Sequence, residues 1–302
     1  MHYKIRLVIT CFAINLLFAV TPDTLFQDSL SIYQDSQIID IDTSDRSQNW
    51  RDLVFPEVNN DAFHIGEKLY FKIRYGFIRA GSAVMEVKRE FVLNARSVYH
   101  LQTTAQSASA FNWIFRVEDE VNSYIDKWGL FSWKFEKKLR EGGYKIDILV
   151  DYDPYTEKAH VDFTRYHKDM TIRKKESYDV ASPAFTYDIL AAFYYIRNLP
   201  LQVGQSVYLT THDEKKVYDL EIKVYKEEIL DVEAGKFRCL MMEPLLKGEG
   251  IFQQKGRLKV WMTNDQYKMP VQMTSEIIVG HITAELEHIE GIGRAIPAQI
   301  KE

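Results

Sequence analysis

Residues that could act as nucleophiles are few in this chain, and none lies in a spacing that such chemistry needs. Ser82 lacks the flanking residues of a strand-to-helix nucleophile turn, so it fits a small residue within a strand. Cys239 lies in an alternating segment after the Ala234-Gly235 turn, where a thiol packs as a small hydrophobic side chain. We therefore predict no nucleophilic catalyst and a buried, inert Cys239.

Metal-ligand spacings are equally rare. The histidines after the N-terminal segment are scattered, and neither a His-x-His nor a His-Glu-x-x-His pattern occurs in the sequence. Asp151-x-Asp153-Pro154 is similar to a fragment of a calcium loop, but the other ligands of such a loop do not follow it. We expect no metal ion and no cofactor.

Paired carboxylates could support glycoside hydrolysis, which needs two acids across a cleft. Glu118-Asp119-Glu120, Asp147 and Asp151 are available, but on strands they fit the solvent-facing side of a sheet. The basic run Arg173-Lys174-Lys175 is followed by Glu176 and indicates a mixed, solvated surface. The net charge of -5 argues against nucleic acid as a partner, because nucleic-acid binding needs a basic face.

Aromatic side chains offer the best candidate for a binding site. One group lies between Phe111 and Phe135 in the sequence, and a second lies on a helical segment from Phe185 to Tyr195. A curved sheet that one helix closes incompletely leaves an apolar groove between them, although the same rings could simply form the core. The candidate ligand-binding residues are Phe111, Trp113, Trp133, Tyr187 and Tyr194.

Strands that would position these residues are indicated by a period of two from Phe63 onward. Such alternation predicts an antiparallel sheet with one solvated face. It is clear in Leu69, Phe71 and Ile73 near the start of the pattern. It continues to a last strand that carries Ile278, Gly280, Ile282, Ala284 and Leu286.

One segment has helical spacing instead, and Pro200 ends it. The residues on its apolar stripe are Ile189, Ala192, Phe193 and Ile196. A weaker helical pattern covers residues 107–115. The predicted fold class is mainly β: a strongly curved antiparallel sheet or half-barrel with one helix, about residues 186–198, packed on its concave face. We expect Phe193 and Ile196 to be buried against the sheet.

The N-terminus has the layout of an export signal. Basic residues precede an apolar run from Leu7 to Val20, which is shorter than the roughly 20 residues of a membrane span. We divide the chain into a signal peptide (1–20), an acidic flexible linker (21–61), a single β-rich domain (62–291) and a C-terminal tail (292–302). We expect a periplasmic protein, and an uncleaved N-terminal anchor is the alternative.

An ordered set of motifs carries a resemblance to a known family. The motifs are Gly66-Glu67 with Leu69 and Tyr70, Tyr75-Gly76 with Ala80-Gly81, Arg140-Glu141-Gly142 with Tyr144, Asp188-Ile189-Leu190 with Phe193-Tyr194-Tyr195-Ile196-Arg197, Ala234-Gly235 with Cys239, and Trp261 with Thr263 and Asp265. From about Phe63 to about Ile289 the chain resembles the bacterial "domain of unknown function 3108" family. The resemblance implies an exported, β-rich protein and implies no reaction.

These observations favour a protein that binds or carries a hydrophobic or amphipathic envelope molecule, such as a lipid or a lipid-linked glycan. The first alternative is an envelope scaffold that holds a protein partner through exposed sheet edges. The second is an enzyme that acts on envelope glycans, although the scattered positions of the candidate catalytic residues argue against an enzyme.

Overall fold

The computed structural model describes residues 53–111, 115–247, 258–276 and 280–301. Within these residues sixteen strands form one sheet, accompanied by the helix α3 (Ile189–Ile196). The strands are β1 (Lys68–Tyr75), β2 (Ile78–Leu93), β3 (Arg96–Ser107), β4 (Glu118–Asp126), β5 (Ser132–Glu141), β6 (Tyr144–Asp153), β7 (Lys158–Tyr166), β8 (Ile172–Ala181), β9 (Tyr187–Asp188), β10 (Ser206–Asp213), β11 (Lys216–Val232), β12 (Gly235–Lys247), β13 (Leu258–Thr263), β14 (Pro270–Glu276), β15 (His281–Glu290) and β16 (Gln299–Ile300). The predicted mainly β class is confirmed.

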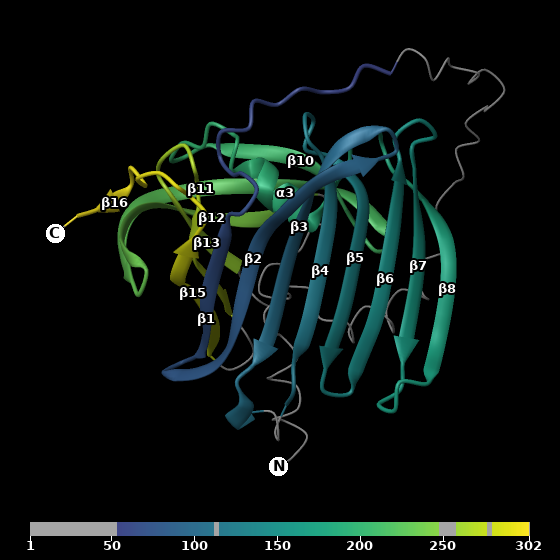
Figure 1. Ribbon diagram of the computed structural model, residues 1–302, viewed down its shortest axis with the longest axis horizontal. Helices are drawn as coiled ribbons and strands as arrows, with labels where there is room; N and C mark the ends of the chain where they lie inside the picture. Colours follow the sequence, from purple (N-terminus) through teal and green to yellow (C-terminus); the bar gives the residue numbers. More distant parts are fainter. Residues whose placement is uncertain (1–52, 112–114, 248–257, 277–279, 302) are drawn as a thin grey trace.

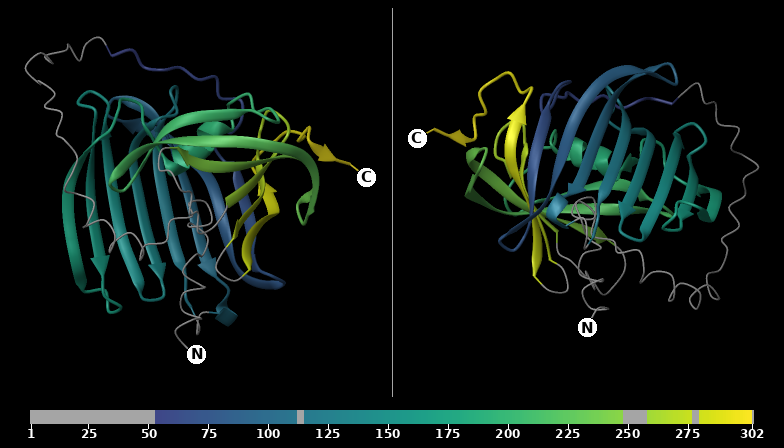
Figure 2. Two further views of the ribbon diagram at one scale, coloured as in Figure 1. Left: turned by 180° about the vertical axis from the view of Figure 1, so that it is seen from behind. Right: turned by 60° about the horizontal axis from the view of Figure 1, so that its bottom comes forward.

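The sheet is open and strongly curved. Its strand order is β8-β7-β6-β5-β4-β3-β2-β1-β15-β14-β13-β12-β11-β10-β9, and β16 pairs with β12. The end strands β8 and β9 do not pair with each other, so the described residues form no closed barrel. Figures 1 and 2 show that β10 to β12 bend over until they face the β3–β6 part of the sheet, with α3 between the two. The sheet therefore wraps around the helix, as predicted.

Alternation places one face of each strand in the core. Leu69, Phe71 and Ile73 on β1 are fully buried, and the residues between them are partly exposed. Several strand pairs carry register shifts, which bend and twist the sheet. At Gly81 on β2, a Cβ atom would collide with the backbone oxygen of Gln106 on β3, so the close approach of these strands needs glycine.

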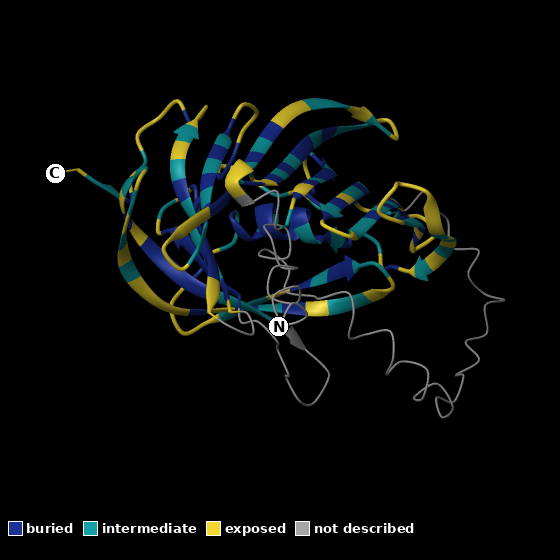
Figure 3. Ribbon diagram, turned by 90° about the horizontal axis from the view of Figure 1, so that it is seen from below, coloured by how far each residue is buried: buried dark blue, intermediate teal, exposed yellow. Residues whose placement is uncertain are grey.

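Helix α3 is shorter than the predicted 186–198. Residues Tyr187 and Asp188 instead form β9, which pairs in parallel with β10. The Asp188 side chain accepts hydrogen bonds of 2.9 Å from the backbone N–H groups of Leu190 and Ala191, so the helix begins at Ile189. Figure 3 shows α3 as a buried element inside the curved sheet. Phe193 and Ile196 are 7% and 4% exposed, which confirms their predicted burial.

The weaker helical pattern over residues 107–115 is largely wrong. Ser107 still belongs to β3, and a single 3-10 turn follows at Ser109–Phe111. Residues 112–114 lie outside the described residues, as does Ile278 of the predicted last strand. Because apolar residues of a short loop can imitate a helical stripe, spacing over so few residues is weak evidence.

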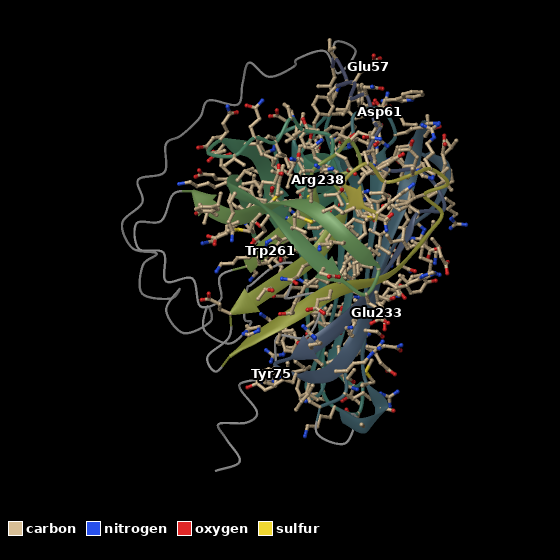
Figure 4. The ribbon with its side chains drawn as sticks, turned by 90° about the vertical axis from the view of Figure 1, so that its left-hand side faces the viewer. Glu57, Asp61, Tyr75, Glu233, Arg238 and Trp261 are labelled. Carbon is tan, nitrogen blue, oxygen red and sulfur yellow. The ribbon has the colours of Figure 1, made fainter. Side chains whose placement is uncertain are left out.

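The chain ends of the described part both pack on the sheet. Before β1, the Phe55 ring lies 5.9 Å from Phe131, and Arg96 stacks over it at 4.1 Å. Figure 4 places Glu57 and Asp61 of this segment at the end of the molecule opposite Tyr75, the last residue of β1. No helix of the described residues is long and apolar enough to cross a membrane.

Candidate functional site

Two of the predicted ligand-binding residues border one aromatic cluster. Trp133 is 2% exposed and packs with Phe131 and Val98, and its indole N–H donates to Asp126 at 3.2 Å. Tyr187 is half-buried against the same cluster. Phe185 and Phe55 also pack against this cluster, so side chains of the protein itself cover much of its ring surface.

The other predicted ligand-binding residues lie elsewhere. Tyr194 is fully buried, and its ring lies 4.9 Å from Phe63 and 5.2 Å from the guanidinium of Arg197. Phe111 ends the 3-10 turn, but its side chain and the whole of Trp113 lie outside the described residues. The structure therefore places Trp133 in this small cluster and Tyr194 in the main core, and Tyr187 packs against both.

An apolar pocket lies on a different face of the helix. It has a volume of about 40 Å³ between α3 and strands β11 to β13. The lining residues are Ile189, Ala192, Phe193, Ile196, Leu220, Ile222, Met242, Pro244, Leu258, Val260 and Met262. The pocket-lining residues of α3 are the same apolar stripe that the sequence predicts to be buried. None of the predicted ligand-binding residues whose side chains the structure describes, Trp133, Tyr187 and Tyr194, lines this pocket, because helical spacing alone does not show which side of α3 faces a space.

The chemistry of this pocket is simple, because every lining side chain is apolar. A space without polar partners holds water poorly and favours an apolar occupant. A cavity of about 150 Å³ holds benzene, so 40 Å³ receives only the narrow end of an apolar group. Met242 and Met262 have three rotatable side-chain bonds each and can repack around such a guest.

A buried ion pair fixes the helix that carries this pocket. Arg197, at the C-terminal end of α3, donates two hydrogen bonds of 2.6 and 2.8 Å to the carboxylate of Glu67. It donates two more, each 3.0 Å, to the backbone oxygens of Tyr267 and Ala62. Both partners of the pair lie in family motifs, but they are separated by 130 positions, and nothing local in the sequence pairs them.

A second buried pair consists of two acids, Asp119 on β4 and Glu141 on β5, with exposures of 3% and 0%. One oxygen of Asp119 accepts a hydrogen bond of 2.8 Å from the backbone N–H of Arg140. The other, and both oxygens of Glu141, have no hydrogen-bond donor among the described residues. Burial raises the pKa of Asp119 to about 7, and burial together with Asp119 raises the pKa of Glu141 well above its usual range. Burial and the proximity of the two acids therefore favour a protonated carboxyl group in this pair.

The predicted solvent-facing role of Asp119 is wrong. Its neighbours Glu118 and Glu120 are at least partly exposed, whereas alternation along β4 turns Asp119 to the inner face. Two carboxyl groups therefore converge, as a glycosidase requires, but their burial leaves a substrate no surface to reach in this conformation. The described residues contain no group of three or more side chains that could hold a metal ion.

Comparison with solved structures finds several proteins of distant sequence, among them the following three. The first is a beta-barrel-like protein with a domain of unknown function, DUF1849, from Brucella abortus, at 12% identity and a TM-score of 0.48 over 78% of this chain and 98% of that one. The second, a candidate exported protein with a YmcC-like fold from Bacteroides fragilis, has 10% identity and a TM-score of 0.32 over 78% and 98%. The third, a candidate lipoprotein from Parabacteroides distasonis, has 11% identity and a TM-score of 0.32 over 78% and 97%.

Comparison with curated proteins finds no match. The family model "Protein of unknown function (DUF3108)" matches residues 70–287. This range runs from β1 into β15 and includes α3. It also includes the Asp119–Glu141 pair and Arg197, whereas Glu67 precedes it. The chain belongs to the DUF3108 family, as its ordered motifs predict.

Proposed function

We propose that this chain is an exported, periplasmic protein that binds the apolar end of a hydrophobic or amphipathic envelope molecule, such as a lipid or a lipid-linked glycan. The observation that carries the proposal is the pocket beside α3, in which eleven side chains converge and all are apolar. Burial of apolar ligand surface there is favourable by roughly 25 cal/mol per Å². Polar parts of the ligand would remain outside, since the lining offers them no hydrogen-bond partner.

The size of the pocket limits the kind of ligand. About 40 Å³ is too small for a ring and suits the methyl end of a saturated chain. Phe193, at 7% exposure, borders this space, so the helix contributes directly to the binding surface. The aromatic cluster around Trp133 is a poorer site, because Phe55 already packs against it.

Two measurements test this proposal. The first is mass spectrometry of the molecules that the protein carries after purification without detergent. The second is binding of a dansyl amide of dodecanoic acid, which leaves the methyl end of the chain unmodified. We expect a co-purified lipid and saturable probe binding. A protein that carries nothing and binds no probe would contradict the proposal.

A pair of variants on α3 locates the site. Ala192→Leu places extra carbon atoms in the pocket and should abolish probe binding. Ala191→Leu adds the same atoms to a neighbouring helical residue that is equally buried but does not line the pocket. Both changes overpack the core, at a typical cost of about 1–3 kcal/mol, so circular dichroism must show both variants folded. Equal probe binding by the two folded variants would place the ligand elsewhere.

An envelope scaffold is the second candidate, favoured by the position of β8 as the last strand of the sheet. Outward-facing Arg173 and Lys175 on this strand oppose the addition of another strand, because charged side chains blunt sheet edges. A stable protein partner, isolated together with a chain that holds no lipid, would favour the scaffold over the binding protein.

A further inference from the structure

The turn between β10 and β11 is fastened across the concave face of the sheet by polar contacts. The Lys137 ammonium on β5 lies 3.8 Å from a carboxylate oxygen of Asp213 and 3.8 Å from one of Glu214. Next to them, Tyr152 on β6 is hydrogen-bonded to His212 at 3.0 Å. These contacts hold the turn against β5 and β6, far from its own neighbours in the sheet order.

The same ammonium faces the buried acid pair. Lys137 and Glu141 alternate on the same face of β5, and Asp119 lies on the adjoining strand β4. Both acids interact electrostatically with the Lys137 ammonium. One cation therefore serves two sets of carboxyl groups, one in the acid pair and one in the β10–β11 turn.

We propose that the Asp119–Glu141 pair is a proton-operated latch that controls how tightly the β10–β11 turn is held on the sheet. With one carboxyl group protonated, the pair carries at most one negative charge, and the Lys137 ammonium attracts mainly the turn carboxylates. When a base in solution removes that proton, the pair gains a negative charge and draws the ammonium away from Asp213 and Glu214. The turn then loses its main electrostatic attachment.

The pH window follows from the direction of the shifts. Burial raises the pKa of Asp119 to about 7, above its ordinary value of 3.8. A carboxyl group whose pKa is raised on folding stabilises the folded state below its unfolded pKa, and this stabilisation is lost as pH rises through the folded pKa. The latch is therefore closed in mild acid and loosens as pH rises through about 7.

Other ionisable groups around the cluster do not produce this behaviour. Burial lowers the pKa of His212 and favours its neutral form, so this ring does not gain charge as pH rises. Burial raises the pKa of Glu214, and deprotonation of Glu214 as pH rises strengthens its attraction to Lys137, which is the opposite of the loosening. Other charged or titratable groups on the surrounding elements include Arg116, Glu118 and Glu120 beside β4, Lys134, Glu136, Lys138 and Arg140 on β5, Asp147 and Asp151 on β6, Glu176 and Tyr178 on β8, Asp188 on β9, and Lys215 and Tyr218 at β11.

Amide hydrogen exchange of residues 206–220, followed by mass spectrometry, tests the latch. Rates are measured from pH 5.5 to 8.5 and divided by the intrinsic exchange rate at each pH. In the natural sequence we expect protection of the turn to fall about tenfold over the two pH units around 7. A flat profile would overturn the proposal.

Variants of the acid pair and of Lys137, with a control variant at Lys134, assign the effect to these residues. Asp119→Asn with Glu141→Gln leaves a neutral pair, so the turn should stay protected at every pH; if this double variant does not fold, Glu141→Gln should at least flatten the profile. Lys137→Met should leave the turn exposed throughout. Lys134→Met changes an outward-facing lysine of the same strand and should keep the natural profile. A natural pH profile in the folded acid variants, or full protection in Lys137→Met, would overturn the latch. None of these outcomes depends on the proposed lipid binding.

Discussion

Replacement of Glu67 by glutamine should destabilise the domain strongly, because it leaves the Arg197 guanidinium buried without its carboxylate. The two side chains are 1% and 0% exposed, and two hydrogen bonds of 2.6 and 2.8 Å join them. Glutamine keeps the size of the side chain but removes the negative charge. Breaking a buried pair in this way costs about 3–5 kcal/mol. That is a large part of the roughly 5–15 kcal/mol by which domains are stable.

Urea unfolding at pH 7, followed by circular dichroism, measures the free energy of unfolding. The matched control is Glu287→Gln, which breaks a pair with Arg79 of similar geometry, 2.7 and 2.8 Å, at the surface. Arg79 is 52% exposed, so water solvates the remaining charge, and the control should cost about 1 kcal/mol or less. Equal losses in the two variants would refute the argument that burial gives the Glu67 pair its importance.

A double-mutant cycle isolates the pair itself. Arg197→Met also removes the hydrogen bonds to the backbone oxygens of Tyr267 and Ala62, so this single variant should be strongly destabilised. In Glu67→Gln with Arg197→Met, no buried charge remains unpaired. The double variant should therefore lose about 1–3 kcal/mol less than the sum of the single losses. Additive losses would mean that the two side chains act independently.

Three further changes test the core. Phe193→Ala should cost about 3–5 kcal/mol in urea unfolding, because the side chain is 7% exposed; a loss well below 1 kcal/mol would indicate an open groove. Cys239 should react with thiol reagents only as fast as the protein unfolds, because burial raises its pKa to about 12; complete labelling of native protein within minutes would contradict this. Gly81→Val should disrupt the β2–β3 pair through collision with the Gln106 backbone, and unchanged thermal stability would show that the strands can separate there.

Local pattern in the sequence predicts the elements and much of the core. Alternation at Leu69, Phe71 and Ile73 predicts a strand with one buried face, and the structure buries all three. The helical stripe that contains Phe193 likewise predicts its burial correctly. Burial of Cys239 is also confirmed. These predictions succeed because the period of a strand or a helix is a property of neighbouring residues.

Local pattern also establishes the family. Motifs spread from Gly66 to Asp265 predict membership of the DUF3108 family, and the family match over residues 70–287 confirms it. The order of motifs along a chain is preserved in the sequence itself, so no structure is needed to read it.

Only the tertiary structure decides which buried residues meet. Glu67 and Arg197 are joined because the sheet brings β1 beside the end of α3. Asp119 and Glu141 favour a protonated carboxyl group because two strands present both acids to the interior, where the Arg140 backbone N–H reaches one oxygen of Asp119 and the other three oxygens have no partner among the described residues. The pocket beside α3 arises because β11 to β13 curve over one side of the helix. Sequence periodicity states that a side chain points inward, whereas the curvature of the whole sheet determines what it contacts.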